Sequence, residues 1–147
     1  DSMFKINKKI EYALISLNYM RGKKEGQLTS AKEISSLFHI PFAPTARVLQ
    51  IMAQNGILQA SQGVHGGYRL KKNLGKISLG DLNNIIAGPI QIASCSKHTG
   101  VCELTSLCTM TSSMNTLNRK LQNLFNTVIL EDFFSQKEAD RTPIPRS

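Results

Sequence analysis

The sequence predicts a mainly α-helical fold with a small β wing and a long final helix. Three patterns predict it: two short helical segments around a tight turn, a glycine-rich hairpin directly after them, and apolar residues spaced alternately by three and four positions near the C-terminus. The 147 residues are 41% hydrophobic and 19% charged, which is typical of one globular domain. Neither a membrane-spanning run nor an export signal is evident, so we expect a cytoplasmic protein that does not enter a membrane.

The positive charge is concentrated in the first half of the chain. Residues 1–80 carry twelve lysines and arginines against four acids, whereas residues 81–147 carry six of each. The net charge of +8 therefore arises entirely from the first half. A field of this kind attracts a polyanion to one end of the molecule.

The first predicted element is a helix over Lys8–Met20, because its apolar residues recur at helical spacing. The residues on this stripe are Ile10, Ala13, Leu14 and Leu17. The lysine- and glycine-rich stretch over residues 22–26 predicts a loop after this helix.

Ser30 and Glu33 form a capping-box pattern that predicts the start of a second helix. In such a box the serine oxygen accepts from the N–H of the glutamate, and the glutamate reaches back to the N–H of the serine. We expect this helix to run through Phe38, with Ile34 and Leu37 facing inward. The proline that follows shortly afterwards ends it.

A third helix is predicted to begin near Pro44, since proline is tolerated in a first turn. Its expected buried face is Val48, Leu49 and Met52, and Asn55-Gly56 end it because they accept left-handed backbone angles. The second and third helices, each about ten residues long around a short turn, form a helix-turn-helix candidate.

A glycine-rich hairpin follows directly. Ile57–Ser61 and Tyr68–Leu70 are typical of strands, and Gln62–Gly67 of the turn between them. Its glycines would let the tip approach a phosphate or a narrow groove. The alternative is an ordinary hairpin, but its place after a helix-turn-helix and the neighbouring charge favour a wing.

The C-terminal part predicts a helix that packs along a narrow seam. Apolar residues step by three and four positions, at Leu107, Met110, Met114, Leu117, Leu121, Leu124 and Val128. A helix from about Thr105 through Phe134 would be roughly 45 Å long. A stripe of this length favours a second copy of the same helix as its partner, which predicts a homodimer.

These elements divide the chain into four expected segments. They are a winged helix-turn-helix DNA-binding domain over residues 3–88, a cysteine-bearing loop over 89–108, a dimerisation helix over 105–134 and a disordered tail over 135–147.

Three cysteines lie within fourteen residues, at Cys95, Cys102 and Cys108. Their odd number argues against a complete set of internal disulfides. An iron–sulfur cluster, a redox switch between two thiols and a tetrahedral zinc site all fit such a group, and we favour them in that order. Zinc is least favoured because no closely spaced C-x2-C pair is present.

The chain resembles the bacterial Rrf2 transcription regulators, a family that includes the iron–sulfur regulator IscR, the nitric-oxide sensor NsrR and the iron-responsive RirA. The resemblance runs from Met3 to about Phe134 and is carried by the following motifs: Tyr12-Ala13, Ser30-Ala31-Lys32-Glu33-Ile34, Asn55-Gly56-Ile57-Leu58, Gly63-Val64-His65-Gly66-Gly67-Tyr68 and Ile77-Ser78-Leu79-Gly80-Asp81. It implies a homodimer that binds an operator in double-stranded DNA, with clustered cysteines that hold an iron–sulfur cluster controlling DNA affinity.

The resemblance also implies a fourth cluster ligand. Where IscR-like members have a histidine after the last cysteine, this chain has Thr111. Where NsrR-like members have a carboxylate before the aromatic-Ala pair, supplied by the other subunit, this chain has Glu11. We favour Glu11 as a ligand over its alternative, a solvated acid near a helix N-terminus. His98 and Glu103 are lesser candidates, and [4Fe-4S] is preferred over [2Fe-2S].

The expected DNA contacts lie on the third helix, on the wing and beside them. Ala43, Thr45, Ala46 and Arg47 would face base edges, and Arg47 can bind guanine with two hydrogen bonds. Lys32, Arg69, Lys71 and Lys72 would meet phosphates. Gln62 and His65 would lie at the wing tip, and Gln62 stands where many family members carry arginine.

No enzyme is expected. The sequence has no nucleophile elbow, phosphate-binding loop or paired acid and base, and we expect no small-molecule substrate. The alternative function is that of a cluster-free regulator that acts through a thiol switch or a protein partner.

Overall fold

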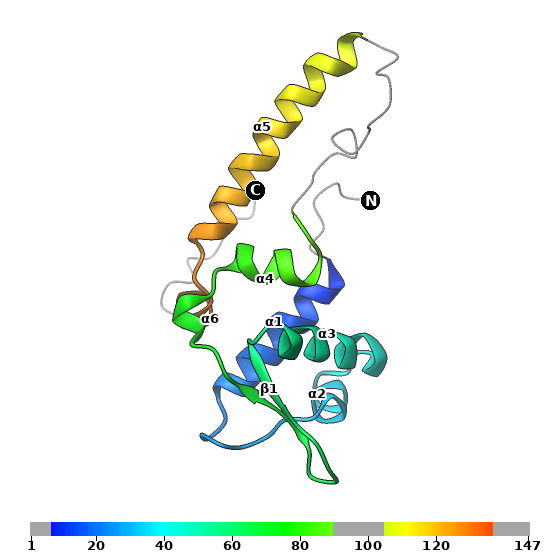
Figure 1. Ribbon diagram of the computed structural model, residues 1–147, viewed down its shortest axis with the longest axis vertical. Helices are drawn as coiled ribbons and strands as arrows, with labels where there is room; N and C mark the ends of the chain where they lie inside the picture. The colour runs from blue at the N-terminus through cyan, green and yellow to red at the C-terminus, as the bar shows by residue number, and fades with distance from the viewer. Residues whose placement is uncertain (1–6, 90–104, 137–147) are drawn as a thin grey trace, which may run out of the picture.

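The computed structural model describes residues 7–89 and 105–136, which form helices and one two-stranded antiparallel sheet (Figure 1). In chain order the elements are α1 (Lys8–Arg21), α2 (Ala31–Phe38), α3 (Phe42–Gln54), β1 (Leu58–Ser61), β2 (Gly67–Leu70), a short 3-10 helix (Leu74–Lys76), α4 (Leu79–Ile86), α5 (Thr105–Thr127) and α6 (Leu130–Phe134). The predicted fold class, mainly helical with a small wing, is confirmed.

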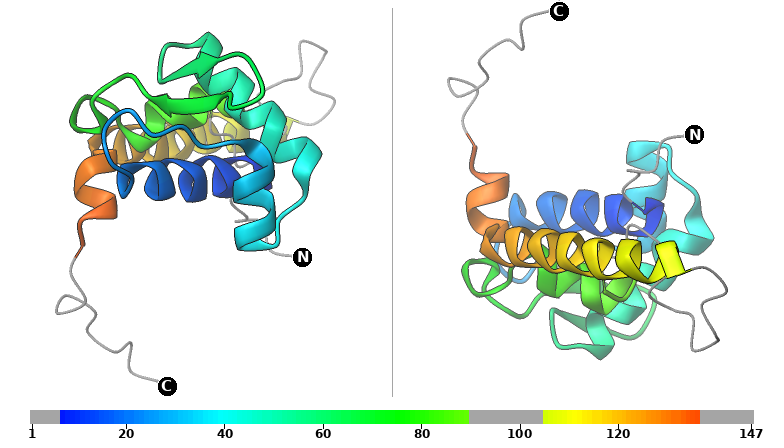
Figure 2. Two further views of the ribbon diagram at one scale, coloured as in Figure 1. Left: turned by 90° about the horizontal axis from the view of Figure 1, so that it is seen from below. Right: turned by 90° about the horizontal axis from the view of Figure 1, so that it is seen from above.

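The core lies between α1, α3 and the elements around them. Ile10, Ala13 and Leu17 of α1 are buried, and Val48, Leu49 and Met52 of α3 are fully buried, as their spacing predicts. Both views of Figure 2 show α1 running through the winged part, with α2 and α3 near one end and α6 near the other. The helix that carries Glu11 is thus packed directly against the third helix of the helix-turn-helix.

The inward position predicted for Leu37 is wrong. Its side chain is 54% exposed, whereas Ala31 and Ile34, in the first half of α2, are buried. The helix ends at Phe38 and the chain turns at His39, whose backbone is left-handed. The last turn of this short helix therefore lies beyond the edge of the core, and its apolar residues face outward.

The wing is held against the segment that precedes α2. Its strands pair from Leu58 opposite Leu70 to Ser61 opposite Gly67. Thr29 and Tyr68 exchange two backbone hydrogen bonds of 2.8 Å. A Cβ atom at Gly67 would lie 2.8 Å from the carbonyl oxygen of Thr29, so this close approach requires glycine.

The prediction of one continuous helix through Phe134 is wrong. Helix α5 ends at Thr127, and α6 begins at Leu130. Between them the Leu79 N–H donates to the Val128 carbonyl at 2.7 Å, and the Leu130 N–H donates to the Ile77 carbonyl at 2.9 Å. These bonds to the start of α4 replace the helical ones, so α5 is about 35 Å long rather than 45 Å.

Helix α5 packs against α4 near its C-terminal end and then extends away from the winged part (Figure 1). Phe125 and Val128 contact the core, but Met110, Leu117 and Leu124 of the predicted seam are exposed in the subunit. None of the described helices is long and apolar enough to cross a membrane. Cys95, Cys102 and the tail from residue 137 lie outside the described residues.

Candidate nucleic-acid interface

Helix α3 presents one face to the core and the opposite face to solvent. The buried face is Val48, Leu49 and Met52, which fixes the rotation of the helix about its axis. Ala43 and Arg47 lie on the exposed side. The predicted base-reading residues Ala43 and Arg47 are therefore accessible to a DNA groove, and Ala46 is half-buried beside them.

The prediction that Thr45 faces DNA bases is wrong. Its side chain is fully buried, and its hydroxyl donates a 2.7 Å hydrogen bond to the carbonyl of Pro41. Pro44 lies in the first turn, and the chain before it is extended at Pro41. Thr45 therefore stabilises the start of α3 from the core side, and its neighbours on the other side are available for contact.

The Arg47 side chain is exposed and forms no ion pair with the described residues. Within residues 7–89 and 105–136, the ion pairs join Lys8 to Glu11, Arg21 to Glu131 and Lys23 to Glu33. The guanidinium of Arg47 is in none of them. An exposed guanidinium without such an ion pair can donate two hydrogen bonds to the edge of a guanine.

The wing adds exposed polar and basic side chains near α3. Gln62 and His65 are exposed in the turn between the strands, and Lys71 and Lys72 are exposed just after β2. The backbone N–H of each lysine donates to the carbonyl of Ile57, which fixes the base of the wing. All four side chains are thus accessible to solvent on the hairpin that follows α3, and their contact with DNA stays a prediction.

Arg69 differs from the two lysines because its guanidinium already has a partner. It lies on β2 and donates a 3.0 Å hydrogen bond to the side chain of Gln59, directly opposite on β1. The side chain is exposed, so a phosphate can still approach its other donors. Gln59 thus orients the arginine on the sheet surface.

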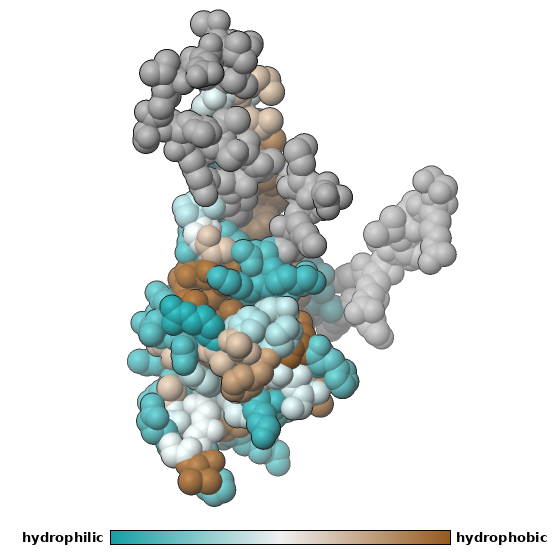
Figure 3. All heavy atoms as spheres, turned by 90° about the vertical axis from the view of Figure 1, so that its right-hand side faces the viewer, coloured by the Kyte–Doolittle hydropathy of each residue, from teal (hydrophilic) through white to brown (hydrophobic). Residues whose placement is uncertain are grey.

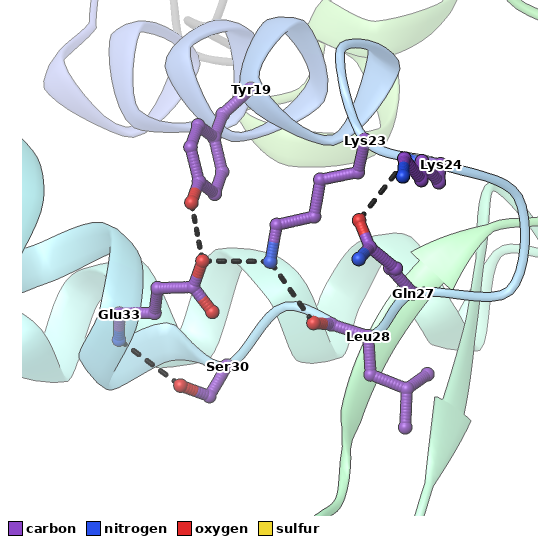
Figure 4. A network of polar contacts seen from close by, with 7 residues as sticks. All are labelled: Tyr19, Lys23, Lys24, Gln27, Leu28, Ser30 and Glu33. Atoms are coloured by element: carbon purple, nitrogen blue, oxygen red, sulfur yellow. Dashed lines mark hydrogen bonds and ion pairs between the residues drawn. The ribbon is translucent and has the colours of Figure 1, made fainter.

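A polar network that the sequence did not indicate connects α1 to α2 (Figure 4). The Glu33 carboxylate accepts from the Tyr19 hydroxyl and pairs with Lys23 at 2.7 Å. Lys23 also donates to the Leu28 carbonyl at 3.1 Å and lies over the Tyr19 ring. Ser30 accepts from the Glu33 N–H at 3.0 Å, as predicted, but Glu33 Oε2 faces α1.

The network shifts the acidity of its two central groups. Desolvation raises the pKa of Glu33, but hydrogen bonds from Lys23 and Tyr19 and the charge of Lys23 outweigh it, so the pKa lies below its usual value. The hydrogen bond to Glu33, together with desolvation and the negative charge, raises the pKa of Tyr19. The glutamate therefore stays charged, and it fixes the start of α2 where the exposed Lys32 lies.

The predicted cluster ligands are not brought together within the described residues. Cys108 lies in the first turn of α5 and its side chain is not described, while Cys95 and Cys102 lie outside the described ranges. Glu11 is partly exposed on α1 and pairs with Lys8 at 3.3 Å. Over the described residues, no three histidine, cysteine or acidic side chains are close enough to hold a metal ion.

A helix-turn-helix with an exposed third helix, a basic wing and a charge excess on the same half defines a winged DNA-binding protein. The family model Rrf2, described as an iron-dependent transcriptional regulator, matches residues 6–136. The chain belongs to this family and is a DNA-binding transcription regulator, not an enzyme.

Several solved structures have the same fold as this chain. Bacillus subtilis CymR, described as the global cysteine regulator, is 21% identical with a TM-score of 0.68, over 92% of this chain and 99% of that chain. The oxidized form of Staphylococcus aureus CymR is 17% identical with a TM-score of 0.68, over 92% and 99%. IscR of T. potens is 14% identical with a TM-score of 0.67, over 98% and 94%. At these identities the likeness establishes the fold.

Proposed function

We propose that this protein is a homodimeric regulator of the bacterial cytoplasm whose affinity for a double-stranded operator is controlled by an iron–sulfur cluster. The observation that carries the proposal is the group of three cysteines between α4 and the start of α5, in a family described as iron-dependent. The cluster ligands would be Cys95, Cys102 and Cys108 of one subunit and Glu11 of the other.

The donor set is chemically suited to such a cluster. Thiolates are the common ligands of iron–sulfur clusters, and three of them leave one position for another donor. The Glu11 carboxylate is partly exposed and its single ion pair, with the exposed Lys8, is weak. It can therefore exchange this partner for a metal. We prefer [4Fe-4S] to [2Fe-2S].

The packing of α1 suggests how such a site would reach the DNA. A bound cluster would respond to nitric oxide, iron supply or redox state, because each of these changes its charge or removes it. Glu11 lies on α1, whose Ile10, Ala13 and Leu17 share a core with α3. A ligand bond at Glu11 would restrain α1, and thereby the angle at which α3 meets the duplex.

The exposed seam of α5 supports the homodimer. Met110, Leu117 and Leu124 repeat at helical spacing and stay exposed, which is costly unless another apolar surface covers them. A second α5 offers the same stripe, and a twofold axis then pairs two copies of α3. Two reading helices about 34 Å apart would meet successive major grooves on one face of the DNA.

The cluster is tested by anaerobic reconstitution of the purified protein with iron and sulfide. We expect visible charge-transfer absorption that is lost in Cys102→Ala. Glu11→Gln should make the absorption decay faster in air, whereas Glu25→Gln, an exposed acid in the loop after α1, should leave the decay unchanged. Wild-type protein without visible absorption after reconstitution would overturn the cluster proposal.

The DNA interface is tested by the salt dependence of operator binding. About 6–10 phosphate contacts predict a 10³–10⁵-fold loss of affinity between 50 and 200 mM salt. Lys71→Gln should reduce the slope by about one, with little effect on sequence preference, and Arg47→Gln should relax the preference at one base pair. Arg119→Gln, which removes an exposed charge on the side of α5 opposite Leu117, is the control. Binding that is independent of salt would exclude this interface.

The second candidate is a redox switch in which two of the three thiols form a disulfide. One observation favours it: a protein of this fold, Staphylococcus aureus CymR, has been solved in an oxidized form. In that case reconstitution gives no visible absorption, and operator affinity changes on mild oxidation and recovers on reduction. A protein partner is indicated instead if neither treatment changes the affinity.

A further inference from the structure

The exposed side chains at the start of α3 are apolar. Phe42, its first residue, is 54% exposed, and Ala43 beside it is exposed as well. The polar residues of the exposed face begin only with Arg47, one turn later. Figure 3 shows the side of the molecule that carries α2 and α3, where hydrophobic residues emerge among hydrophilic ones.

The fold holds these residues outward. The Thr45 hydroxyl fixes the start of α3 to the Pro41 carbonyl at 2.7 Å. The Ser35 hydroxyl donates to the Ile40 carbonyl at 2.7 Å, and the Ile40 N–H donates back to the Ser35 carbonyl at 3.2 Å. These bonds fix the turn between α2 and α3 on both sides, and Phe42, which follows this turn, is exposed.

The charge around this surface identifies the kind of partner. Arg47 lies one turn after Ala43 on the exposed side of α3, without an ion pair among the described residues, and Lys71 and Lys72 are exposed at the base of the wing. A polyanion is therefore the occupant that the surroundings favour. The N-terminal turn of a recognition helix is also the part that reaches base edges.

We propose that Phe42 and Ala43 read the C5-methyl groups of thymines in the major groove, next to a guanine bound by Arg47. This rests on the proposed placement of α3 in the major groove. The thymine methyl is the apolar group that base pairs present there, and aromatic or alanine side chains are suited to contact it. Arg47 follows Ala43 by four residues, about 6 Å along the helix, so both contacts fall within neighbouring base pairs.

The apolar end of α2 offers an internal control for the proposed contact between Phe42 and thymine. Leu37 is also 54% exposed, but it lies on α2, and the Phe38 ring packs edge-on against Tyr19 at 5.6 Å. If exposed apolar area alone determined the affinity for the operator, Leu37 and Phe42 would contribute equally to that affinity. If the first turn of α3 contacts thymine methyl groups, only Phe42 contributes to the preference for thymine over deoxyuridine.

The test begins with selection of bound duplexes from a random pool, which is expected to return half-sites with thymine beside guanine. Each half-site thymine is then replaced by deoxyuridine, which removes the methyl group and keeps base pairing. We expect wild-type affinity to fall about fourfold for each contacted methyl. Deoxyuridine in the flanking sequence should have no effect.

The protein variants complete a double-mutant cycle. Phe42→Ala should bind the thymine and deoxyuridine operators almost equally, whereas Leu37→Ala should keep the wild-type difference. Equal binding of both operators by wild type, or a full methyl effect in Phe42→Ala, would overturn the inference. So would equal losses of affinity in Leu37→Ala and Phe42→Ala, which would indicate a partner other than thymine. Failure of the DNA interface itself is distinguishable, because then no sequence is selected and Arg47→Gln has no effect.

Discussion

The winged part and α5 use apolar side chains in opposite ways. In the winged part, Leu17, Ile34 and Leu49 are fully buried, so each subunit closes this core by itself. Along α5, Leu117 and Leu124 are exposed although they repeat with the same regularity. The contrast implies that the winged part folds through contacts within one chain, whereas the apolar stripe of α5 is the surface that a second α5 would cover in the proposed homodimer.

The largest expected effect is that of a core substitution. Leu49→Ala leaves a cavity between α1 and α3 and should lower the free energy of unfolding by about 3 kcal/mol. Leu124→Ala removes a side chain that is 57% exposed in the subunit, so it should weaken only the part of the stability that depends on protein concentration. Urea unfolding at several protein concentrations separates the two. If both variants lost the same free energy of unfolding at every protein concentration, the contrast between the winged part and α5 would be wrong.

A charge in the seam of α5 should separate the subunits. Leu117→Lys places two ammonium groups where we expect the helices to meet, and the protein should sediment as a monomer. Operator affinity should then fall about 100-fold, because the two reading heads no longer bind together. Asn115→Lys adds the same charge on the opposite side of the helix and should leave the dimer intact. A dimeric Leu117→Lys protein would exclude this seam as the interface.

The wing depends on backbone proximity rather than on core volume. Gly67→Ala would place a Cβ atom 2.8 Å from the Thr29 carbonyl oxygen, and neither strand can move without losing its pairing. We expect a loss of about 2 kcal/mol in the free energy of unfolding and weaker operator binding. At Gly22 the new Cβ would be 3.5 Å from the Tyr19 carbonyl, an ordinary contact, so Gly22→Ala should change little. Similar losses in both variants would show that the close approach is unimportant.

The sequence predicted those elements whose signals are local. Asn55-Gly56 ends α3 and Ser30 caps α2 because both effects act within a few residues. The burial of Val48, Leu49 and Met52 followed from helical spacing alone. The order of elements in the winged part could therefore be predicted, because these signals are local.

The errors come from contacts between distant parts of the chain. Helix α5 stops at Thr127 because residues 128–130 hydrogen-bond to residues 77–79, some fifty residues earlier. Thr45 faces the core because of how α3 is rotated against α1, and Leu37 lies outside because α2 extends past the core edge. Among the site residues, Arg47 and the wing lysines are exposed as required, and their contacts with DNA remain predictions.

The smallest expected effect concerns the network that links α1 to α2. Because the pKa of Glu33 lies below its usual value of 4.5, its charged form stabilises the fold above that pH, and this contribution is lost as the pH falls through the lowered pKa. Since the Glu33 side chain is 37% exposed, solvent screening limits the contribution to about 1 kcal/mol.

Glu33→Gln isolates this contribution, because the amide oxygen can still accept from Tyr19 but carries no charge for Lys23. The difference in unfolding free energy between wild type and Glu33→Gln should be about 1 kcal/mol at neutral pH and should vanish once the pH has fallen below the lowered pKa of Glu33. Glu25→Gln, in the exposed loop, should differ little from wild type throughout. A Glu33→Gln difference that does not change with pH would mean that packing, not charge, joins α1 to α2.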